Sequence, residues 1–174
     1  YAAPQENPVP GLIKAIEADK KIKVYLSATI TRTSGAPGQF SADISAESGT
    51  TQTENIGAII QASGFTPYDA NKLPELGYGK SKDVVDHLGL ERLAVAAKGG
   101  AIKRPSDGKE VKSVAFVQCA GSRDENHLAY CSGICCLASL KQATYIREQA
   151  PESKAFIYYI DVRAMGKYED FYTK

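Results

Sequence analysis

The chain lacks an excess of charge of either sign, and it lacks any long apolar run. Its 174 residues include 21 Lys and Arg against 20 Asp and Glu, which gives a formal net charge of +1. Because no basic stripe offers an electrostatic footprint for nucleic acid, no nucleic-acid partner is expected. No apolar run approaches the roughly 20 residues that a membrane-spanning helix needs, so any membrane contact is expected to be indirect, through a partner subunit.

Signals that would point to other classes of protein are also missing. The opening residues, YAAPQENPVPG, contain neither an initiator Met nor the apolar core of a signal peptide. Neither a Ser/His/Asp triad nor a pair of catalytic carboxylates is evident, and there are no internal repeats or low-complexity tracts. From this start, and from the C-terminal YEDFYTK, we expect the chain to be a piece of a longer polypeptide.

The first half of the chain predicts a short helix, a β-hairpin and one buried strand. Apolar periodicity predicts a helix over 11–19 and a strand over 21–35. A turn over 35–39 would lead into a return strand over 40–46, and a polar loop over 47–54 would follow. Residues 55–64 form a nearly continuous apolar run, which is typical of a strand buried on both faces of a parallel sheet.

The second half predicts a βαβ unit. A helix is expected over 81–98 and a polar loop over 105–112. The unit itself consists of a buried strand over 113–119, a helix over 131–149 and a third apolar strand over 154–163, and the helix offers Leu137, Leu140, Tyr145 and Ile146 to the core. This order predicts an α/β fold with a parallel sheet and a right-handed crossover.

All four cysteines lie in one stretch, CAGSRDENHLAYCSGICC, from Cys119 to Cys136. Disulfides fit poorly, because this chain is not a small disulfide scaffold and vicinal Cys135 and Cys136 cannot pair without strain. The C-x11-C-x3-C-C spacing also lacks the two short knuckles of most zinc sites, and Cys119 stands alone. A [4Fe-4S] cubane is bulkier than one ion and accepts less regular ligands, so the spacing favours a cluster on Cys119, Cys131, Cys135 and Cys136.

Other interpretations of the cysteines stay open. They could hold zinc, they could be buried as small apolar side chains, or Cys135 and Cys136 could form a redox-active dithiol. The predicted placement favours a cluster, because Cys119 ends a strand and the other three open the following helix, where backbone N–H groups stabilise an anion. Cys131 and Cys135 would share a helical face, with Cys136 about 100° further round.

A nucleotide-binding loop is absent from the point where the βαβ unit would place one. Dinucleotide folds have G-x-G-x-x-G between the strand and the helix, whereas this chain has CAGSRD, with Gly121 as the only glycine in the immediate turn. No NAD(P)H site is therefore expected here.

The residues around the cysteines resemble a known family. VAFVQCAGSRDENHLAYCSGICCLASLKQA, followed by AFIYYIDVRAMGKYEDFY, is similar to the signature of the A-subunit family of heterodisulfide reductases. TSGAPGQF, NIGAIIQASGFTPYDANKL and LGYG extend the resemblance upstream, so that it covers nearly the whole chain from about Lys21. Within the family, RPSDGK and CAGSRDENHLAYCS look closest to the quinone-interacting membrane-bound oxidoreductase, to its B chain first and to its A chain second.

The resemblance implies a fold, cofactors and partners. Family members are flavin and iron–sulfur proteins on a thioredoxin-reductase-like frame, in which residues 1–110 would be a remnant of the FAD domain and residues 111–174 a Rossmann-like βαβ unit. The four cysteines would ligate a [4Fe-4S] cluster. The complex would pass electrons between membrane quinone and adenylylsulfate reductase in sulfur metabolism, as a cytoplasmic assembly bound peripherally to the membrane.

Some other residues follow from the resemblance or from their position. IIQASGF resembles a family segment that passes near FAD, which makes Ser63 and Gly64 candidate flavin neighbours; tight FAD binding by this chain alone is not expected. Arg123 and Lys141 could offset the charge of the thiolates, or be ordinary surface charges. Further candidates are His127, as a substitute ligand, a proton relay or an exposed loop histidine, and Asp161 with Arg163, as an ion pair or a partner contact.

The function expected from all of this is single-electron transfer. The alternative is a structural or docking module of the same complex, with zinc or no metal at the cysteines.

Overall fold

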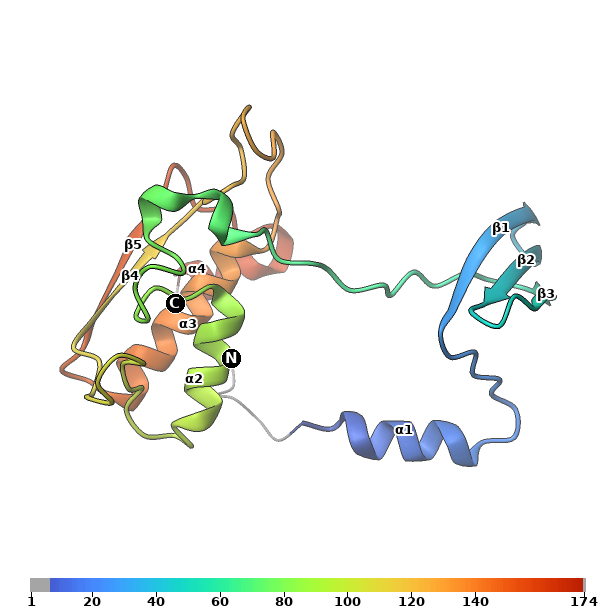
Figure 1. Cartoon of the computed structure of the whole chain (residues 1–174), viewed down its shortest axis with the longest axis horizontal. Coiled ribbons are helices and arrows are strands. Elements are labelled where there is room, and N and C mark those ends of the chain that lie inside the picture. The colour runs from blue at the N-terminus through green and yellow to red at the C-terminus, as the bar shows by residue number, and fades with distance from the viewer. Residues whose placement is uncertain (1–6, 174) are drawn as a thin grey trace. The chain divides into compact units, whose positions relative to one another are not determined.

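A computed structural model describes residues 7–173 of the chain. By their contacts the described residues form two compact units, Asn7–Thr66 and residues 67–173. Each unit is considered by itself (Figure 1). The predicted boundary at residue 110 separates a remnant of an FAD domain from the βαβ unit. The contacts do not test that evolutionary relation, so this boundary stays a prediction.

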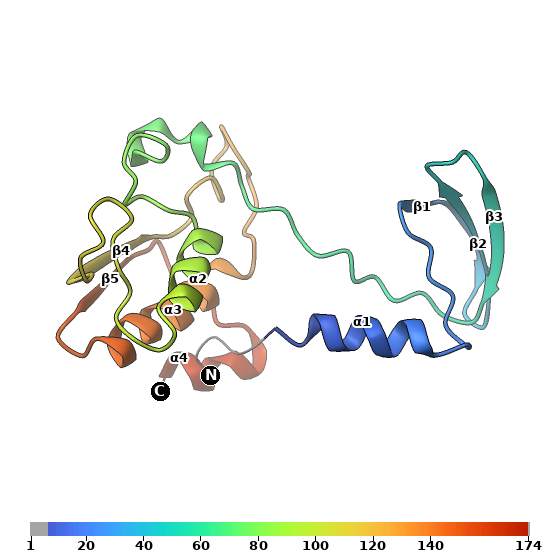
Figure 2. The same ribbon diagram turned by 60° about the horizontal axis from the view of Figure 1, so that its bottom comes forward.

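The Asn7–Thr66 unit contains one helix and an antiparallel sheet. Helix α1 (Val9–Ala18) is followed by the strands β1 (Ala28–Ala36), β2 (Gln39–Ala46) and β3 (Thr51–Ile56), in the order β1-β2-β3. Figure 2 shows the three strands side by side. The predicted helix and hairpin are confirmed, but the first strand begins at Ala28 and not at residue 21. The hairpin turn depends on Gly35, where a Cβ would overlap the Gln39 carbonyl oxygen.

Two predictions for this unit are wrong. The polar residues 51–54 form most of β3 instead of a loop, because Thr-rich segments suit an exposed strand paired with β2. The apolar run 55–64 is not a buried strand: it ends β3 and continues without regular structure, with Ile59 43% and Ile60 89% exposed. A run of apolar residues becomes a central strand only where other elements cover both of its faces.

The second unit contains the expected βαβ arrangement. Strands β4 (Ser113–Val117) and β5 (Lys154–Tyr158) pair in parallel, from Ser113 opposite Lys154 to Val117 opposite Tyr158. Helix α3 (Cys135–Gln149) connects them, and helix α2 (His87–Ala96) lies beside α3. The remaining elements are short: η1 (Ala70–Lys72), η2 (Pro74–Leu76), η3 (Gly166–Tyr168) and α4 (Glu169–Thr173).

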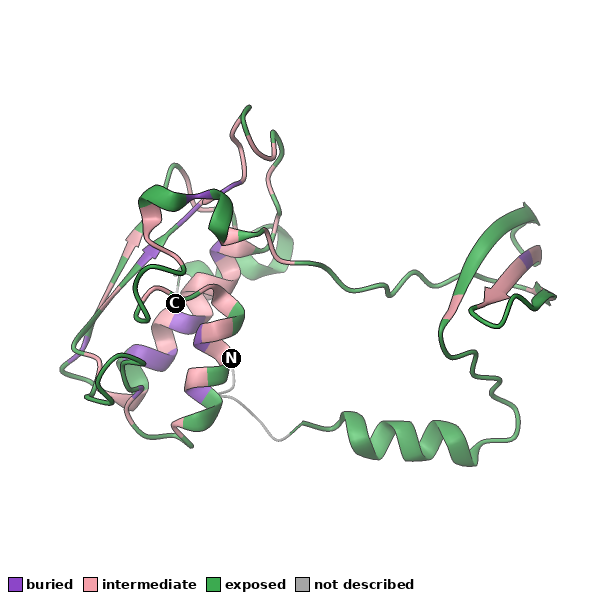
Figure 3. Ribbon diagram, in the orientation of Figure 1, coloured by how far each residue is buried: buried purple, intermediate pink, exposed green. Residues whose placement is uncertain are grey.

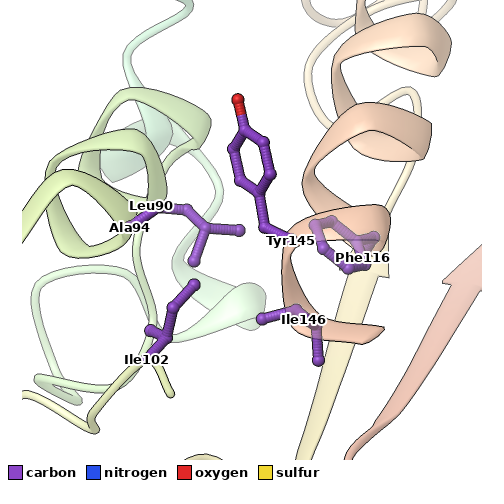
Figure 4. Packing of buried hydrophobic residues seen from close by; sticks show 6 residues of the cluster. All are labelled: Leu90, Ala94, Ile102, Phe116, Tyr145 and Ile146. Carbon is purple, nitrogen blue, oxygen red and sulfur yellow. The ribbon is translucent and has the colours of Figure 1, made fainter. Parts of the chain in front are cut away.

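The core of this unit lies between the two long helices and one face of the sheet. Its buried residues, shown close up in Figure 4, are Leu90, Ala94, Ile102, Phe116, Tyr145 and Ile146. Figure 3 shows burial concentrated on these elements. The strands bury one face only, because alternate side chains such as Val117, Phe156 and Tyr158 are exposed. The prediction of a buried strand over 113–119 is therefore right for the face of β4 toward α3 and wrong for the other face.

Both long helices begin later than predicted, for local reasons. The Asp86 carboxylate accepts a hydrogen bond from the Gly89 N–H (2.6 Å), so this N-cap starts α2 at His87 and not at residue 81. The predicted helix over 131–149 starts at Cys135, because Gly133 has φ +72° and interrupts helical geometry before it.

The fold class is thus mixed α/β, with an antiparallel hairpin sheet and a parallel two-stranded sheet. Within residues 7–173, none of the helices has the length and apolar character needed to cross a bilayer.

Candidate functional site

The four cysteines gather where the parallel strands end and α3 begins. Gln118 follows β4 and continues the strand pairing by one residue, since its N–H donates to the Tyr158 carbonyl (2.8 Å), and Cys119 comes next. Cys135 and Cys136 are the first two residues of α3. The carboxyl edge of a parallel sheet is where α/β folds place their binding sites, so this part of the sequence prediction agrees with the topology.

Cys119 turns the chain sharply as it leaves the sheet. Its φ is +57°, in the left-handed region that residues other than glycine rarely adopt, and Arg123 has φ +58°. The Ser122 N–H donates to the Cys119 carbonyl (3.1 Å) and closes this turn. The position of the Cys119 sulfur is therefore set by a tight backbone turn and not by a flexible strand end.

The segment between Cys119 and Cys131 is a loop whose two arms pair with each other. The Arg123 N–H donates to the Tyr130 carbonyl (3.1 Å), and the Leu128 N–H donates to the Gly121 carbonyl (3.2 Å). Because Tyr130 precedes Cys131, the first of these bonds links the position of Arg123 to that of Cys131. The loop is irregular in structure but internally hydrogen-bonded.

An aromatic side chain from earlier in the chain packs on this loop. The ring of Tyr68 occupies the space that a Cβ on Gly121 would need, and Gly121 itself has φ +78°. The Tyr68 hydroxyl is hydrogen-bonded to Nδ1 of His127, and the two rings meet edge to face. His127 is thus half-buried and bonded to Tyr68, so the prediction of an exposed loop histidine is wrong, and its roles as a ligand or proton relay stay predictions.

Cys131 lies in the loop, before the helix, so the prediction that Cys131 and Cys135 share a helical face is wrong. The Gly133 N–H points at the Cys131 sulfur (3.4 Å), and the Cys135 N–H points at the Ser132 hydroxyl (3.4 Å). No side chain caps α3 at Ile134. The N–H group that meets a thiol therefore belongs to Gly133, before the helix, and the predicted stabilisation by N–H groups of the helix N-terminus stays a prediction.

Cys136 is the most buried of the four thiols, at 6% exposed, and the other three are half-buried. Its S–H donates to the Asp161 carbonyl oxygen, with sulfur and oxygen 3.9 Å apart. Burial raises the pKa of the Cys136 thiol, and the neighbouring Cys135 and Cys119 act in the same direction because a second thiolate nearby is repelled. Three of the four sulfurs are thus electrostatic neighbours.

The thiols do not form a finished site for a single ion. In the part of the chain that the structure describes, no three Cys, His, Asp or Glu side chains are near enough to one another to hold one metal ion. All four cysteines are free thiols. A shared centre would have to span sulfurs that are further apart than the ligands of one ion.

An ion network borders the thiols. The Asp161 carboxylate accepts a hydrogen bond from Arg123 (Nη1 to Oδ1, 2.6 Å) and another from Arg163 (Nε to Oδ1, 3.2 Å). Arg163, and then Arg123, holds the pKa of Asp161 below its ordinary value. Asp161 raises the pKa of Arg163 further, and Cys131 adds to this because it lies beside the guanidinium. Of the two alternatives for Asp161 and Arg163, the structure shows the ion pair, and a contact with a partner stays a prediction.

The two basic residues predicted to flank the thiols have separate roles. Arg123 belongs to the network just described, whereas Lys141 pairs with Glu91 of α2 (3.3 Å) and lies over the Tyr145 ring. Sequence reasoning missed the closeness of Arg163 to Cys131. The one sequence feature that could have indicated it is that Arg163 follows the end of the second parallel strand, and the parallel topology places that end beside the end of the first.

Ser63 and Gly64 belong to the Asn7–Thr66 unit, whereas the cysteines belong to the other. Both are exposed and lie outside regular secondary structure, and Gly64 has φ +69°. Their suggested role as flavin neighbours stays a prediction.

Comparison with known proteins gives consistent relatives. The second of two iron-sulfur A subunits of CoB–CoM heterodisulfide reductase in Methanopyrus kandleri is 47% identical over 125 residues, which are 70% of this chain and 19% of that protein. The A subunit of the ferredoxin/F(420)H(2)-dependent CoB-CoM heterodisulfide reductase of Methanosarcina acetivorans is 44% identical over 68% of this chain and 15% of its own length. The A subunit of the H(2):CoB-CoM heterodisulfide,ferredoxin reductase of Methanothermobacter marburgensis is 42% identical over 68% of this chain and 19% of its own length.

The matched part is therefore less than a fifth of each of these relatives. No protein-family model matches the chain.

Proposed function

Over about 70% of its length this chain belongs to the A-subunit family of heterodisulfide reductases, and we propose that it transfers single electrons within an oxidoreductase complex through an iron–sulfur centre on Cys119, Cys131, Cys135 and Cys136. The observation that carries the proposal is that Cys119, Cys135 and Cys136 are electrostatic neighbours where β4 ends and α3 begins, while Cys131 lies beside Arg163. The relative from Methanopyrus kandleri is an iron-sulfur subunit, which supports the same chemistry.

The donor set fits a cluster better than one ion. Four thiolates are the ligands of [2Fe-2S] and [4Fe-4S] centres, and a cubane reaches ligands that are too far apart to share one ion. Cys119, Cys135 and Cys136 are electrostatic neighbours, so the proposal needs Cys131 to complete the set. When bound, such a cluster supplies reversible one-electron chemistry without bond-making.

The chain's own residues would hold and tune the centre. Four thiolates carry negative charge, which the guanidinium groups of Arg123 and Arg163 and the Gly133 N–H beside Cys131 would offset. Offsetting the negative charge stabilises the reduced, more anionic state of a cluster and so raises its reduction potential.

The wider assignment rests on the family. We assign to the larger protein a thioredoxin-reductase-like frame that carries FAD, with Ser63 and Gly64 as its neighbours there. The partners proposed are the other subunits of a heterodisulfide-reductase-like complex and, in the quinone-interacting branch, adenylylsulfate reductase. Such a complex would be cytoplasmic and would meet the membrane only through another of its subunits.

Anaerobic reconstitution of the chain with iron and sulfide tests the iron–sulfur centre. We expect broad visible absorption that dithionite bleaches, with about four irons per chain for a cubane. Replacing any one of the four cysteines by Ser should reduce iron retention. The control Ser139→Ala, on helix α3 with Cys135 and Cys136, should not. A chain that stays colourless and binds one zinc ion when iron and zinc are both offered would instead indicate a structural or docking module. A chain that binds no metal would indicate the same.

A further inference from the structure

We propose that Asp161 is a positioning residue that holds the thiols of Cys131 and Cys136 in place. The inference deepens the proposed function and rests on it for the identity of the centre. Asp161 is not a ligand in this assignment. It joins, through its side chain and its backbone, the separate segments that carry two of the four sulfurs.

The side chain of Asp161 fixes the loop. Its carboxylate accepts a 2.6 Å charge-assisted hydrogen bond from Arg123, which is 38 residues away in sequence. Arg123 in turn donates its backbone N–H to Tyr130, the residue before Cys131. The ion pair therefore restrains both arms of the loop that carries Cys131, and hydrogen bonds between charged groups are among the strongest available for this purpose.

The same carboxylate orients a second guanidinium beside Cys131. Arg163 reaches both oxygens of Asp161, with Nε 3.2 Å from Oδ1 and Nη2 3.3 Å from Oδ2. In this orientation the guanidinium lies next to the Cys131 thiol. Without the carboxylate, Arg163 would lose its anchor and would also face an unpaired Arg123.

The backbone around Asp161 contacts the other sulfur. The Asp161 carbonyl oxygen accepts the S–H of Cys136 (3.9 Å), and the backbone N–H of Arg163 also faces that sulfur. One short segment after β5 thus touches both Cys131, through side chains, and Cys136, through backbone. An irregular loop and the regular helix α3 are connected at this point.

The test uses the metal-free, reduced chain and measures the alkylation rate of each cysteine by mass spectrometry. In Asp161→Asn we expect Cys131 to react roughly tenfold faster, because a charge-assisted hydrogen bond that restrains its loop is lost. Asp161→Glu should restore part of the protection. Asp107→Asn, which removes the exposed ion pair with Arg104, is the matched control and should leave all four rates unchanged.

A second readout uses the iron-loaded chain. Release of iron to a chelator should be about 10- to 100-fold faster in Asp161→Asn, which is the usual effect of removing a partner that orients metal ligands. In an Arg123→Gln/Arg163→Gln background the Asp161→Asn substitution should add nothing, since its partners are already gone. A purely structural role would not show this dependence on the arginines.

The outcomes separate the two proposals. If the unsubstituted chain does not bind iron, the proposed function is wrong. The alkylation rates would still test whether Asp161 positions the thiols. Unchanged Cys131 alkylation in a folded Asp161→Asn chain would overturn the positioning role, whether or not iron binds. If Asp161→Asn does not fold, Arg163→Gln is measured instead: faster Cys131 alkylation supports the positioning role and an unchanged rate overturns it.

Discussion

At the scale of single residues, the loop that carries the thiols is fixed by a glycine and the ring beside it. Gly121 combines a left-handed backbone with a space filled by Tyr68. Gly108, in the same unit, has a similar φ of +69° but open space around it. The two glycines therefore allow the cost of backbone strain to be separated from the cost of the steric overlap.

We expect Gly121→Ala to lower the free energy of unfolding by about 2–4 kcal/mol, the sum of a left-handed alanine and an overpacked contact. Gly108→Ala should lower the free energy of unfolding by only about 1 kcal/mol, because it introduces a left-handed alanine without a steric overlap. Urea unfolding of both variants measures the difference. In a Tyr68→Ala background the extra cost of Gly121→Ala should largely disappear; if it stays the same, the ring does not limit this position.

The sequence could indicate the four thiols but not what surrounds them. Cys119 to Cys136 form a local cluster whose residue type and spacing are read directly from the chain. Tyr68 and Arg163 lie far from that cluster in sequence, and only the tertiary fold brings them to it. Lys141 is the opposite case, because it is close to the cysteines in sequence but its side chain pairs with Glu91 of α2.

At the scale of elements, a polar network joins α2 to α3 inside an otherwise apolar contact. Gln142 is 1% exposed, and its amide donates to the His87 carbonyl (2.8 Å) and to Glu91 (3.2 Å). The Tyr145 hydroxyl and Lys141 meet the same carboxylate. Buried polar groups with complete partners fix one relative placement of two helices, which apolar packing alone does less strictly.

Gln142→Ala should lower the free energy of unfolding by about 2–3 kcal/mol, because it leaves a cavity and removes two buried hydrogen bonds. Glu148→Ala, an exposed change on the same helix, should stay within about 0.5 kcal/mol. Thermal or urea unfolding checks both. A Gln142 variant as stable as the Glu148 variant would show that the network adds nothing to the helix contact.

Element types were predictable where local chemistry decides them. The hairpin turn, helix α1 and the strand–helix–strand order all follow from glycine positions and apolar period. The apolar run 55–64 predicts a buried strand but is exposed, since burial depends on which elements cover a segment and that information is not local. The Asp86 cap and the Gly133 interruption explain the late helix starts and were readable signals that were missed.

At the scale of the whole molecule, two irregular stretches differ in how well their backbones are held. Residues 57–66 are exposed or nearly so and lack regular structure, with apolar side chains such as Ile60 and Phe65 on the surface. The loop between Cys119 and Cys131 also lacks long elements, but backbone hydrogen bonds tie its arms together. Local stability should therefore differ between them.

Limited digestion with thermolysin should cut first at exposed apolar residues before Pro67, and a fragment containing α2 to α4 should persist. Proteases cleave exposed, weakly held backbone before hydrogen-bonded loops. Mass spectrometry of timed samples locates the cuts, and Ile59→Ser with Ile60→Ser should slow those within 57–66. Early cleavage between Cys119 and Cys131 would contradict the view that this loop is restrained.

The place of Tyr68 against Gly121 has a practical consequence, because the chain contains no tryptophan. Tyr68→Trp would introduce a single indole beside the turn that follows Cys119, and its fluorescence could be excited selectively. Emission from that indole would report changes in the loop. Energy transfer to a coloured metal centre would quench the emission, so the assembly of the centre could be followed in real time through the indole alone.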